Sequence, residues 1–413
     1  MAQFNLTTAS NLFKIKYGKL SENTYNSANV LLARTKKNFD FTGKRKDIAV
    51  PTSFSGGVGS GSLPTPNYAA VQDAVITAKK MYSVIQIDRE AIKASSQNEG
   101  AFVELTKYSV QKGVESWMRN MSRALFNGDV TYSDASVGNG ALGVTTAAAA
   151  GGTAAAPTVV ISAATWKEAN FEEKDYVMVD SAANAYSTSN VWEITAVAPS
   201  TRTITLSRIS GSVDLTADSG AKTLVMQNSK ASDPTGLKTV LDATSGSLYG
   251  ITVGRRWQAG SQIAAGGAGI TTDLLNQQML EVQRKSGKVP NLILTSFTQF
   301  RKILNVLEDQ KTYFVEPRSP ELQGKISFRA VEFMSSAGPV PILPERFVDD
   351  DRVYCLNDNY ISLEHRPDFG WFDDDGSVFL RTASSDAYEA RFGGYLESYI
   401  VPSFHGVITG LAT

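Results

Sequence analysis

The clearest hydrophobic periodicity in the chain predicts a long helix from about Asn98 to Phe126. Its apolar positions follow one another at intervals of seven, four, three, four and three residues, which places them on one stripe of a helix. Gly128 is placed to end this helix. At a rise of roughly 1.5 Å per residue the helix would be about 40 Å long, which is longer than a small globular domain needs. The stripe consists of Val103, Val110, Val114, Trp117, Met121 and Ala124.

Two shorter amphipathic helices and a buried strand are predicted in the C-terminal half. One helix follows residues 271–273, and another begins at Ser296, whose spacing to Gln299 is that of a capping box. The apolar run at 290–294 predicts a buried strand between them. Strands dominate the remainder, including 386–392, so helices and strands are partly segregated. This pattern indicates an α+β fold.

The N-terminal part of the chain lacks a core-forming pattern. Residues 1–38 are polar and weakly periodic, which indicates an extended arm. Within 39–88, two extended stretches flank a segment rich in Gly, Ser and Pro at 53–66. This composition predicts a long β-hairpin with a mobile end. Because such a hairpin cannot bury a core by itself, we expect it to need another surface to lie on.

From 144 to 229 the helical periodicity disappears. Short β-type runs, such as 175–179 and 191–197, are separated by turn residues at short spacing. This pattern is typical of a small sandwich or barrel. We therefore expect an inserted all-β domain.

Composition excludes several classes of protein. The 413 residues are 42% hydrophobic and 20% charged with a net charge of -1, which excludes a wholly disordered chain and a globally basic nucleic-acid binder. One cysteine and two histidines exclude a disulfide framework and a multi-cysteine zinc site. The start of the sequence lacks the pattern of a secretory signal, so we expect the protein to stay in the cytoplasm in which it is made.

Short motifs with possible chemistry do not form a catalytic set. Asp368-Phe369-Gly370 stands without the other kinase motifs, and 373–376 breaks the calcium-loop pattern. The glycines at 56–61 lack the Lys-Ser/Thr of a phosphate-binding loop. Cys355 is expected to be a buried inert thiol and His405 a packing or hydrogen-bonding residue. We expect no catalytic residue, cofactor or metal.

Charge is segregated within the neutral total. Residues 1–47 hold nine basic and three acidic side chains, a balance of +6, and 345–375 hold ten acidic and three basic, a balance of -7. Opposite charges near the two ends suit head-to-tail contacts between copies, although ordinary solvated charge is an equal alternative. The candidate inter-subunit contacts are Lys36, Lys37, Lys44, Arg45, Lys46, Phe54, Asp349, Asp350, Asp351, Asp373, Asp374 and Asp375.

An arm, a Gly-tipped hairpin, a long helix and a mixed domain, in this order, resemble the major capsid protein of tailed bacteriophages, which has the HK97-like fold. Local sequence is similar to that family along nearly the whole chain except about 144–229. The similar stretches are 124–129, 233–239, 290–300, 353–357, 371–377 and 406–411.

The resemblance implies a domain organisation. Its parts would be a 1–38 N-terminal arm, a 39–88 E-loop, an 89–143 peripheral domain with the spine helix, a 144–229 inserted domain, a 230–344 axial domain, 345–404 peripheral return strands and a 405–413 axial tail.

The resemblance also implies the function. The protein would self-assemble as pentamers and hexamers into the icosahedral shell of a virion, built in the host cytoplasm around double-stranded DNA that it does not contact sequence-specifically. We expect a separate scaffolding protein, a portal and possibly a decoration protein as partners, and no membrane.

Two alternatives remain at this point. An encapsulin-like nanocompartment shell would share the fold but enclose enzymes. A surface protein could instead bind carbohydrate through the inserted domain, where aromatic side chains would supply stacking surfaces unless they are core and rim residues. These side chains are Trp166, Tyr176, Tyr186 and Trp192.

Overall fold

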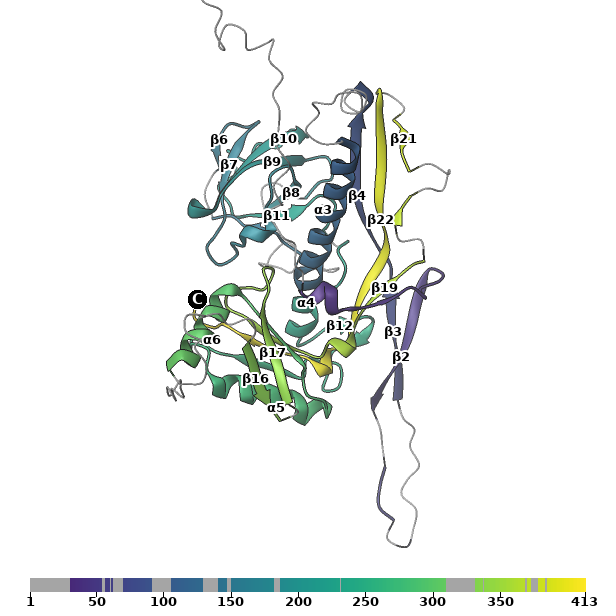
Figure 1. Cartoon of the computed structure of the whole chain (residues 1–413), viewed down its shortest axis with the longest axis vertical. Helices are drawn as coiled ribbons and strands as arrows, with labels where there is room; N and C mark the ends of the chain where they lie inside the picture. Colours follow the sequence, from purple (N-terminus) through teal and green to yellow (C-terminus); the bar gives the residue numbers. More distant parts are fainter. Residues whose placement is uncertain are drawn as a thin grey trace, which may run out of the picture. The chain divides into compact units, whose positions relative to one another are not determined.

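The computed structural model of the chain divides into two compact units (Figure 1). The first unit includes 80–121 and 368–395, and the second includes 29–79, 122–367 and 396–413. The structure describes residues 30–53, 56–59, 61, 70–90, 105–128, 140–146, 150–181, 186–230, 232–309, 331–336, 338–367, 370–372, 378–382 and 385–413.

In the first unit, helix α3 packs on a sheet. Trp117 of the helix donates a hydrogen bond from Nε1 to the carbonyl of Met81 at 3.3 Å, and its ring meets Phe392 edge-on at 5.7 Å. The helix approaches the sheet closely at Gly113, where an added Cβ would lie 2.4 Å from Ile85 Cδ1. The elements are α3 (Leu105–Asn127, to residue 121 in this unit), β4 (Lys79–Asp88), β20 (Gly370–Trp371), β21 (Leu380–Arg381) and the first part of β22 (Ala387–Ile400). The described part of the helix therefore agrees with the predicted periodicity and ends next to Gly128.

A six-stranded mixed sheet forms one core of the second unit. Its order is β14-β23-β18-β15-β17-β16, and helices α5 and α6 pack on the face that carries Ile293, Ile342 and Cys355. Burial raises the pKa of Cys355 to about 12, so its thiol is neutral. The elements are β14 (Ser261–Ala264), α5 (Thr272–Ser286), β15 (Leu292–Thr295), α6 (Phe297–Asp309), β16 (Val331–Ser335), β17 (Gly338–Pro344), β18 (Val353–Leu356) and β23 (Gly406–Thr409).

Helix α6 is capped differently from the prediction. Ser296 Oγ accepts from the Gln299 N–H at 3.2 Å, which is the expected half of a capping box. The Gln299 side chain does not return to Ser296; its Nε2 donates to the carbonyls of Asp350 at 2.7 Å and Ala412 at 2.6 Å. The reciprocal bond is lost because this buried amide instead satisfies two distant carbonyls.

The segment after α3 forms a closed barrel. Its strands follow the order β5-β11-β8-β9-β10-β7-β6, and an antiparallel bridge between Thr145 and Ile161 joins the ends of β5 and β7. The interior is filled by apolar side chains that include the fully buried Trp192 and Leu206. The strands are β5 (Gly143–Val144), β6 (Gly151–Gly152), β7 (Pro157–Val160), β8 (Tyr176–Ser181), β9 (Val191–Ala198), β10 (Thr203–Ser210) and β11 (Lys222–Met226).

The remaining elements of the second unit include a separate two-stranded hairpin, β2–β3. Strand β1 runs parallel to β19, which pairs with residues 396–400 of β22. The paired hairpin spans 45–77, within the predicted 39–88, because β4 joins the sheet of the first unit. The elements are α1 (Val30–Arg34), β1 (Lys36–Asn38), β2 (Arg45–Ser53), β3 (Ala70–Thr77), α4 (Leu237–Asp242), β12 (Ser247–Leu248), β13 (Ile251–Thr252) and β19 (Ile361–His365).

Buried Glu397 makes the stability of the second unit depend on pH. Its Oε1 accepts from the N–H groups of Thr235 at 2.7 Å and Ser398 at 3.0 Å, but burial outweighs these bonds and raises its pKa to about 7. The folded state therefore binds a proton that the unfolded state releases near pH 4.5. The stability that protonated Glu397 contributes is fully present below pH 4.5 and is lost as the pH rises through about 7.

We expect Glu397→Gln to remove this dependence while keeping both hydrogen bonds. The variant should gain about 1–3 kcal/mol over the wild type at pH 8 and nothing at pH 4.5. Denaturant unfolding across pH 4.5–8 measures the difference, with the exposed Glu332→Gln as the control. If the free energy of unfolding fell equally with pH in the Glu397 variant and in the wild type, Glu397 would not be the source of the pH dependence.

Candidate functional site

The β2–β3 hairpin is a candidate contact element because it lacks a core. Every described residue of β2 is exposed or half-buried, and only Ala74 and Ile76 of β3 are buried. At the tip Val58 is 96% exposed, and Val71 on β3 is 56% exposed. Within the second unit the tip extends away from the other elements (Figure 1). These strands present apolar side chains that the described part of the subunit leaves exposed, although the outer edge of β3 makes one backbone hydrogen bond, from the Val75 N–H to the Tyr249 carbonyl at 2.8 Å.

The root of the hairpin is fixed by the buried carboxylate of Glu364 on β19. Its side chain accepts from Lys46 Nζ at 2.7 Å, Asn38 Nδ2 at 2.8 Å and Ser362 Oγ at 2.7 Å. Glu364 is 1% exposed, so these bonds compensate for removing a charge from water. Partial burial opposes the charge of Lys46, but hydrogen bonds to Asp40 and Glu364 outweigh it and raise the lysine pKa.

Aromatic contacts complete this root. The ring of Phe39 stacks on His365 at 5.1 Å, and the Arg366 guanidinium lies 5.7 Å from the ring of Phe41. Burial, together with the charge of Lys37, lowers the pKa of His365 to about 4. His365 is therefore neutral at physiological pH, and its ring packs against Phe39 instead of acting as a cation or an acid-base group.

Some side chains of the predicted basic and acidic segments pair with one another inside the subunit. The parallel pairing of β1 with β19 brings the basic N-terminal segment beside the acidic one. Lys46 pairs with Glu364 at 2.7 Å, and Arg34 lies 3.8 Å from Asp358. Lys46 is therefore engaged within its own chain, and its role in contacts between copies stays a prediction. The sequence could not reveal this pairing because the partners are far apart along the chain.

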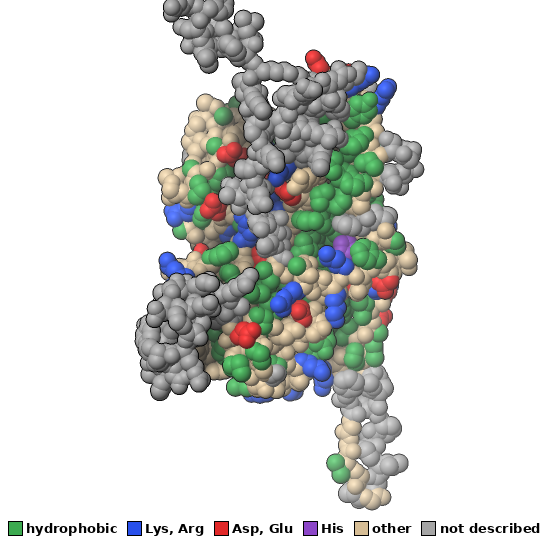
Figure 2. Space-filling view, in the orientation of Figure 1, with side chains coloured by type: hydrophobic (Ala, Val, Ile, Leu, Met, Phe, Trp, Pro, Cys, Tyr) green, Lys and Arg blue, Asp and Glu red, His purple; other side chains and the backbone are tan. Residues whose placement is uncertain are grey.

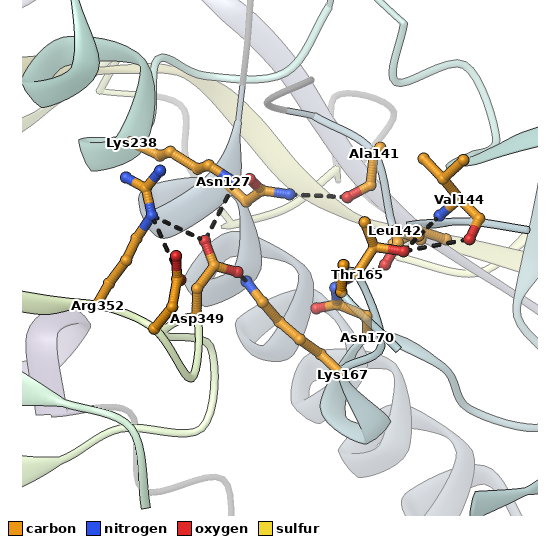
Figure 3. Close-up of a pocket in the computed structure, with 13 residues that line it drawn as sticks. Asn127, Ala141, Leu142, Val144, Thr165, Lys167, Asn170, Lys238, Asp349 and Arg352 are labelled. Carbon is orange, nitrogen blue, oxygen red and sulfur yellow. Dashed lines mark hydrogen bonds and ion pairs between the residues drawn. The ribbon is translucent and has the colours of Figure 1, made fainter. Parts of the chain in front are cut away.

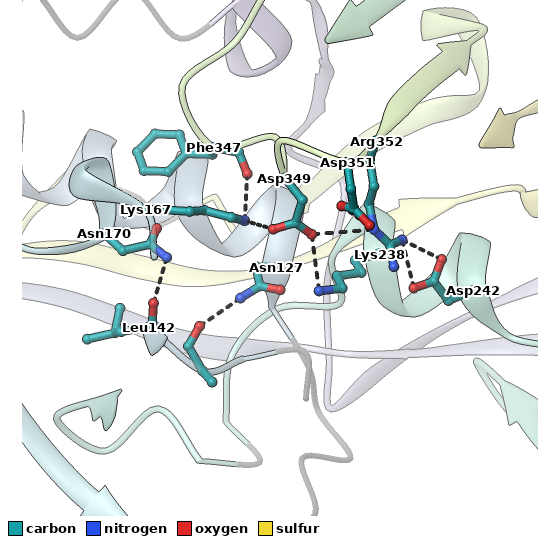
Figure 4. A network of polar contacts seen from close by, with 11 residues as sticks. Asn127, Leu142, Lys167, Asn170, Lys238, Asp242, Phe347, Asp349, Asp351 and Arg352 are labelled. Atoms are coloured by element: carbon teal, nitrogen blue, oxygen red, sulfur yellow. Dashed lines mark hydrogen bonds and ion pairs between the residues drawn. The ribbon is translucent and has the colours of Figure 1, made fainter. Parts of the chain in front are cut away.

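Asp349 is likewise paired inside its own chain. Its carboxylate lies 2.5 Å from Lys167 Nζ, 3.1 Å from Lys238 Nζ and 3.5 Å from Arg352 Nε (Figure 4). Burial favours the neutral form, but the three cations outweigh it and hold the pKa of Asp349 well below its usual range. Asp349 is therefore engaged within its own chain rather than available to another copy.

The other charged candidates stay predictions. Arg45 pairs with Asp47 at 3.0 Å, and Asp351 lies 3.8 Å from Arg352 while its side chain is 42% exposed. Lys36, Lys37, Lys44 and Asp350 are exposed, whereas Phe54, Asp373, Asp374 and Asp375 lie outside the described residues. On the face drawn in Figure 2, basic and acidic side chains are interspersed rather than gathered by sign.

A polar cavity of about 130 Å³ lies beside Asp349 (Figure 3). Asn127 Nδ2 donates to the carbonyl of Ala141 at 2.7 Å, and Asn170 Nδ2 donates to that of Leu142 at 2.9 Å. Its lining contains neither His nor Cys, and no group of three metal-ligating side chains occurs among the described residues. Polar walls of this kind suit ordered water.

The aromatic side chains considered for carbohydrate stacking do not form one exposed surface. Trp192 is fully buried in the barrel, so a stacking role for it is wrong. Trp166 stacks on Phe171 at 5.4 Å, and Lys230 lies 5.3 Å from the ring of Tyr186. Of the four candidates, Tyr176 is exposed, at 44%.

The fold is that of a viral shell protein. The chain aligns with the capsid asymmetric unit of cyanophage A-1(L) at a TM-score of 0.60 and 9% identity, covering 99% of this chain and 100% of that one. The capsid protein of a native GTA particle aligns at 0.51 and 10% identity over the full length of both chains. The SrpI encapsulin of Synechococcus elongatus PCC 7942 aligns at 0.47 and 8% identity, covering 100% of this chain and 96% of that one.

Family membership follows from the sequence itself. The model of the SU10 major capsid protein family matches residues 65–369, well over half of the chain. The chain therefore belongs to the SU10 major capsid protein family and is a tailed-phage major capsid protein with the HK97-like fold. A comparison with curated proteins finds no match. In the part of the chain that the structure describes, no helix is long and apolar enough to cross a membrane.

The root of the hairpin generates a stability prediction. We expect Lys46→Met to destabilise the subunit by about 1–3 kcal/mol, because the buried Glu364 loses a charge-assisted hydrogen bond. Denaturant unfolding measures the loss, and the neighbouring exposed Lys44→Met is the matched control. Equal stability of the two variants would show that Lys46 does not fix the root.

Proposed function

We propose that copies of this chain form the pentamers and hexamers of the icosahedral shell, and that the β2–β3 hairpin of each copy lies on a neighbouring subunit. The observation that carries the proposal is the hairpin itself, since its strands are exposed while its root is held by buried Glu364. An element held firmly at one end and uncovered at the other is arranged to bury surface elsewhere. Several modest interfaces per subunit then add up through multivalency.

The domain organisation stays part of this proposal. Residues 39–88 would be the E-loop, 89–143 and 345–404 the peripheral domain, and 230–344 with 405–413 the axial domain, with 144–229 inserted. The shell would enclose double-stranded DNA without reading its sequence. The net charge of -1 and the interspersed charges on the face drawn in Figure 2 support this, because a strongly basic wall would hold DNA through phosphate contacts. A scaffolding protein, a portal and possibly a decoration protein would complete the particle.

The test is to shorten the hairpin without disturbing its root. Residues 51–71 are replaced by Asn-Gly, which closes the strands by a two-residue turn and leaves Lys46 in place. We expect the variant to fold with wild-type thermal stability but to form at least tenfold fewer closed shells when co-expressed with its phage morphogenetic genes. Negative-stain microscopy counts the particles.

A conservative change at the same place provides the control. Val58→Ile keeps the apolar tip and should assemble like the wild type. Normal shell yield from the shortened variant would overturn the proposed role of the hairpin.

A further inference from the structure

The barrel joins the rest of the second unit through two chain segments that meet at one point. The chain leaves α3 at Gly128 and returns at Gly236, whose N–H donates to the Gly128 carbonyl at 2.9 Å. An added Cβ on Gly128 would lie 2.1 Å from the carbonyl oxygen of Pro234. Thr239 Oγ1 donates to the same Gly128 carbonyl at 2.9 Å. The entry and exit of the barrel therefore form a single crossing, the geometry of a hinge.

A separate contact lies away from this crossing. Lys167, in the segment between β7 and β8, reaches Asp349 at 2.5 Å and donates to the carbonyl of Phe347 at 3.1 Å (Figure 4). Only 14% of the Lys167 side chain and 18% of the Asp349 side chain are exposed. Lys238 and Arg352 face the same carboxylate from the other side, and Arg352 is held by both oxygens of Asp242 at 2.7 and 2.8 Å. The Asp349 side of this contact is thus pre-organised to receive one lysine.

The cavity lies between these two points of attachment. It is bounded by Asn127 at the end of α3, by barrel residues such as Thr165, and by Asp349 and Arg352 (Figure 3). The Oδ1 atom of Asn127 is buried and has no hydrogen-bond partner among the described residues. Around this cavity the contact encloses polar space, and such a contact resists movement less than a packed core does.

We propose that the Lys167–Asp349 ion pair is a latch, and that opening it lets the inserted barrel rotate about the Gly128–Gly236 crossing. The barrel has its own apolar core and closed strand ladder, so it can move as a rigid body. Breaking the latch leaves the crossing, with the adjoining hydrogen bond from Asn127 to the Ala141 carbonyl, as the pivot. This inference concerns the isolated subunit and holds whether or not the proposed hairpin contact is correct.

A distance measurement within the full chain tests the latch. Thiol labelling is selective because Cys355 is the one cysteine and is buried. Spin labels are attached at Thr201→Cys on the barrel and Lys288→Cys after α5, both exposed positions, and double electron–electron resonance measures their separation. We expect one narrow distribution in the parent and a clearly broader one, or a second population, in Lys167→Gln. Lys174→Gln is the matched control, since it removes an exposed barrel ion pair with Glu193.

A charge-conserving variant separates the latch from simple loss of folding. Lys167→Arg should give a distribution narrower than that of Lys167→Gln, because it keeps a positive charge facing Asp349. Amide exchange in β9 must stay at the parent level in every variant, which shows that the barrel itself remains folded. An unchanged distribution in Lys167→Gln, loss of β9 protection in that variant, or a distribution in Lys167→Arg as broad as that of Lys167→Gln would each overturn the proposal.

Discussion

A buried carboxylate must find donors or cations wherever the chain can bring them, and this constraint organises the second unit. Glu364 takes its partners from the N-terminal segment, and Asp349 takes its partners from the barrel and from α4. Leaving either carboxylate buried without these partners would be costly. Each therefore ties together parts of the chain that the apolar cores alone would not hold in register.

The same constraint separates what the subunit completes from what it leaves open. Apolar cores and buried ion pairs account for the barrel, the mixed sheet and the hairpin root. The hairpin strands have these contacts only near the root, at Lys46, Ala74 and Ile76, while their other described residues are exposed or half-buried. In the proposed assembly such an element would become ordered where copies meet and would add specificity to that contact.

Sequence reasoning succeeded where the signal is local. The periodicity around Trp117, the short strands of the barrel and the start of α6 at Ser296 all depend on near neighbours. It failed where the partner is remote: net charge suggested that Asp349 faces another copy, yet its cations come from positions 167, 238 and 352. Glu364 stood within an apolar strand, which is a usable sign of a buried paired acid, but the sequence does not identify Lys46 as its partner.

The bridge between Thr145 and Ile161 affects how many strand edges the barrel exposes to other molecules. By closing the ladder between β5 and β7 it leaves the two-residue strand β6 as a short edge of the barrel, and short edges offer little backbone for uncontrolled pairing between β-proteins. In the proposed shell, this closure would leave the longer strands of the hairpin as the part of the chain better suited to contact another copy.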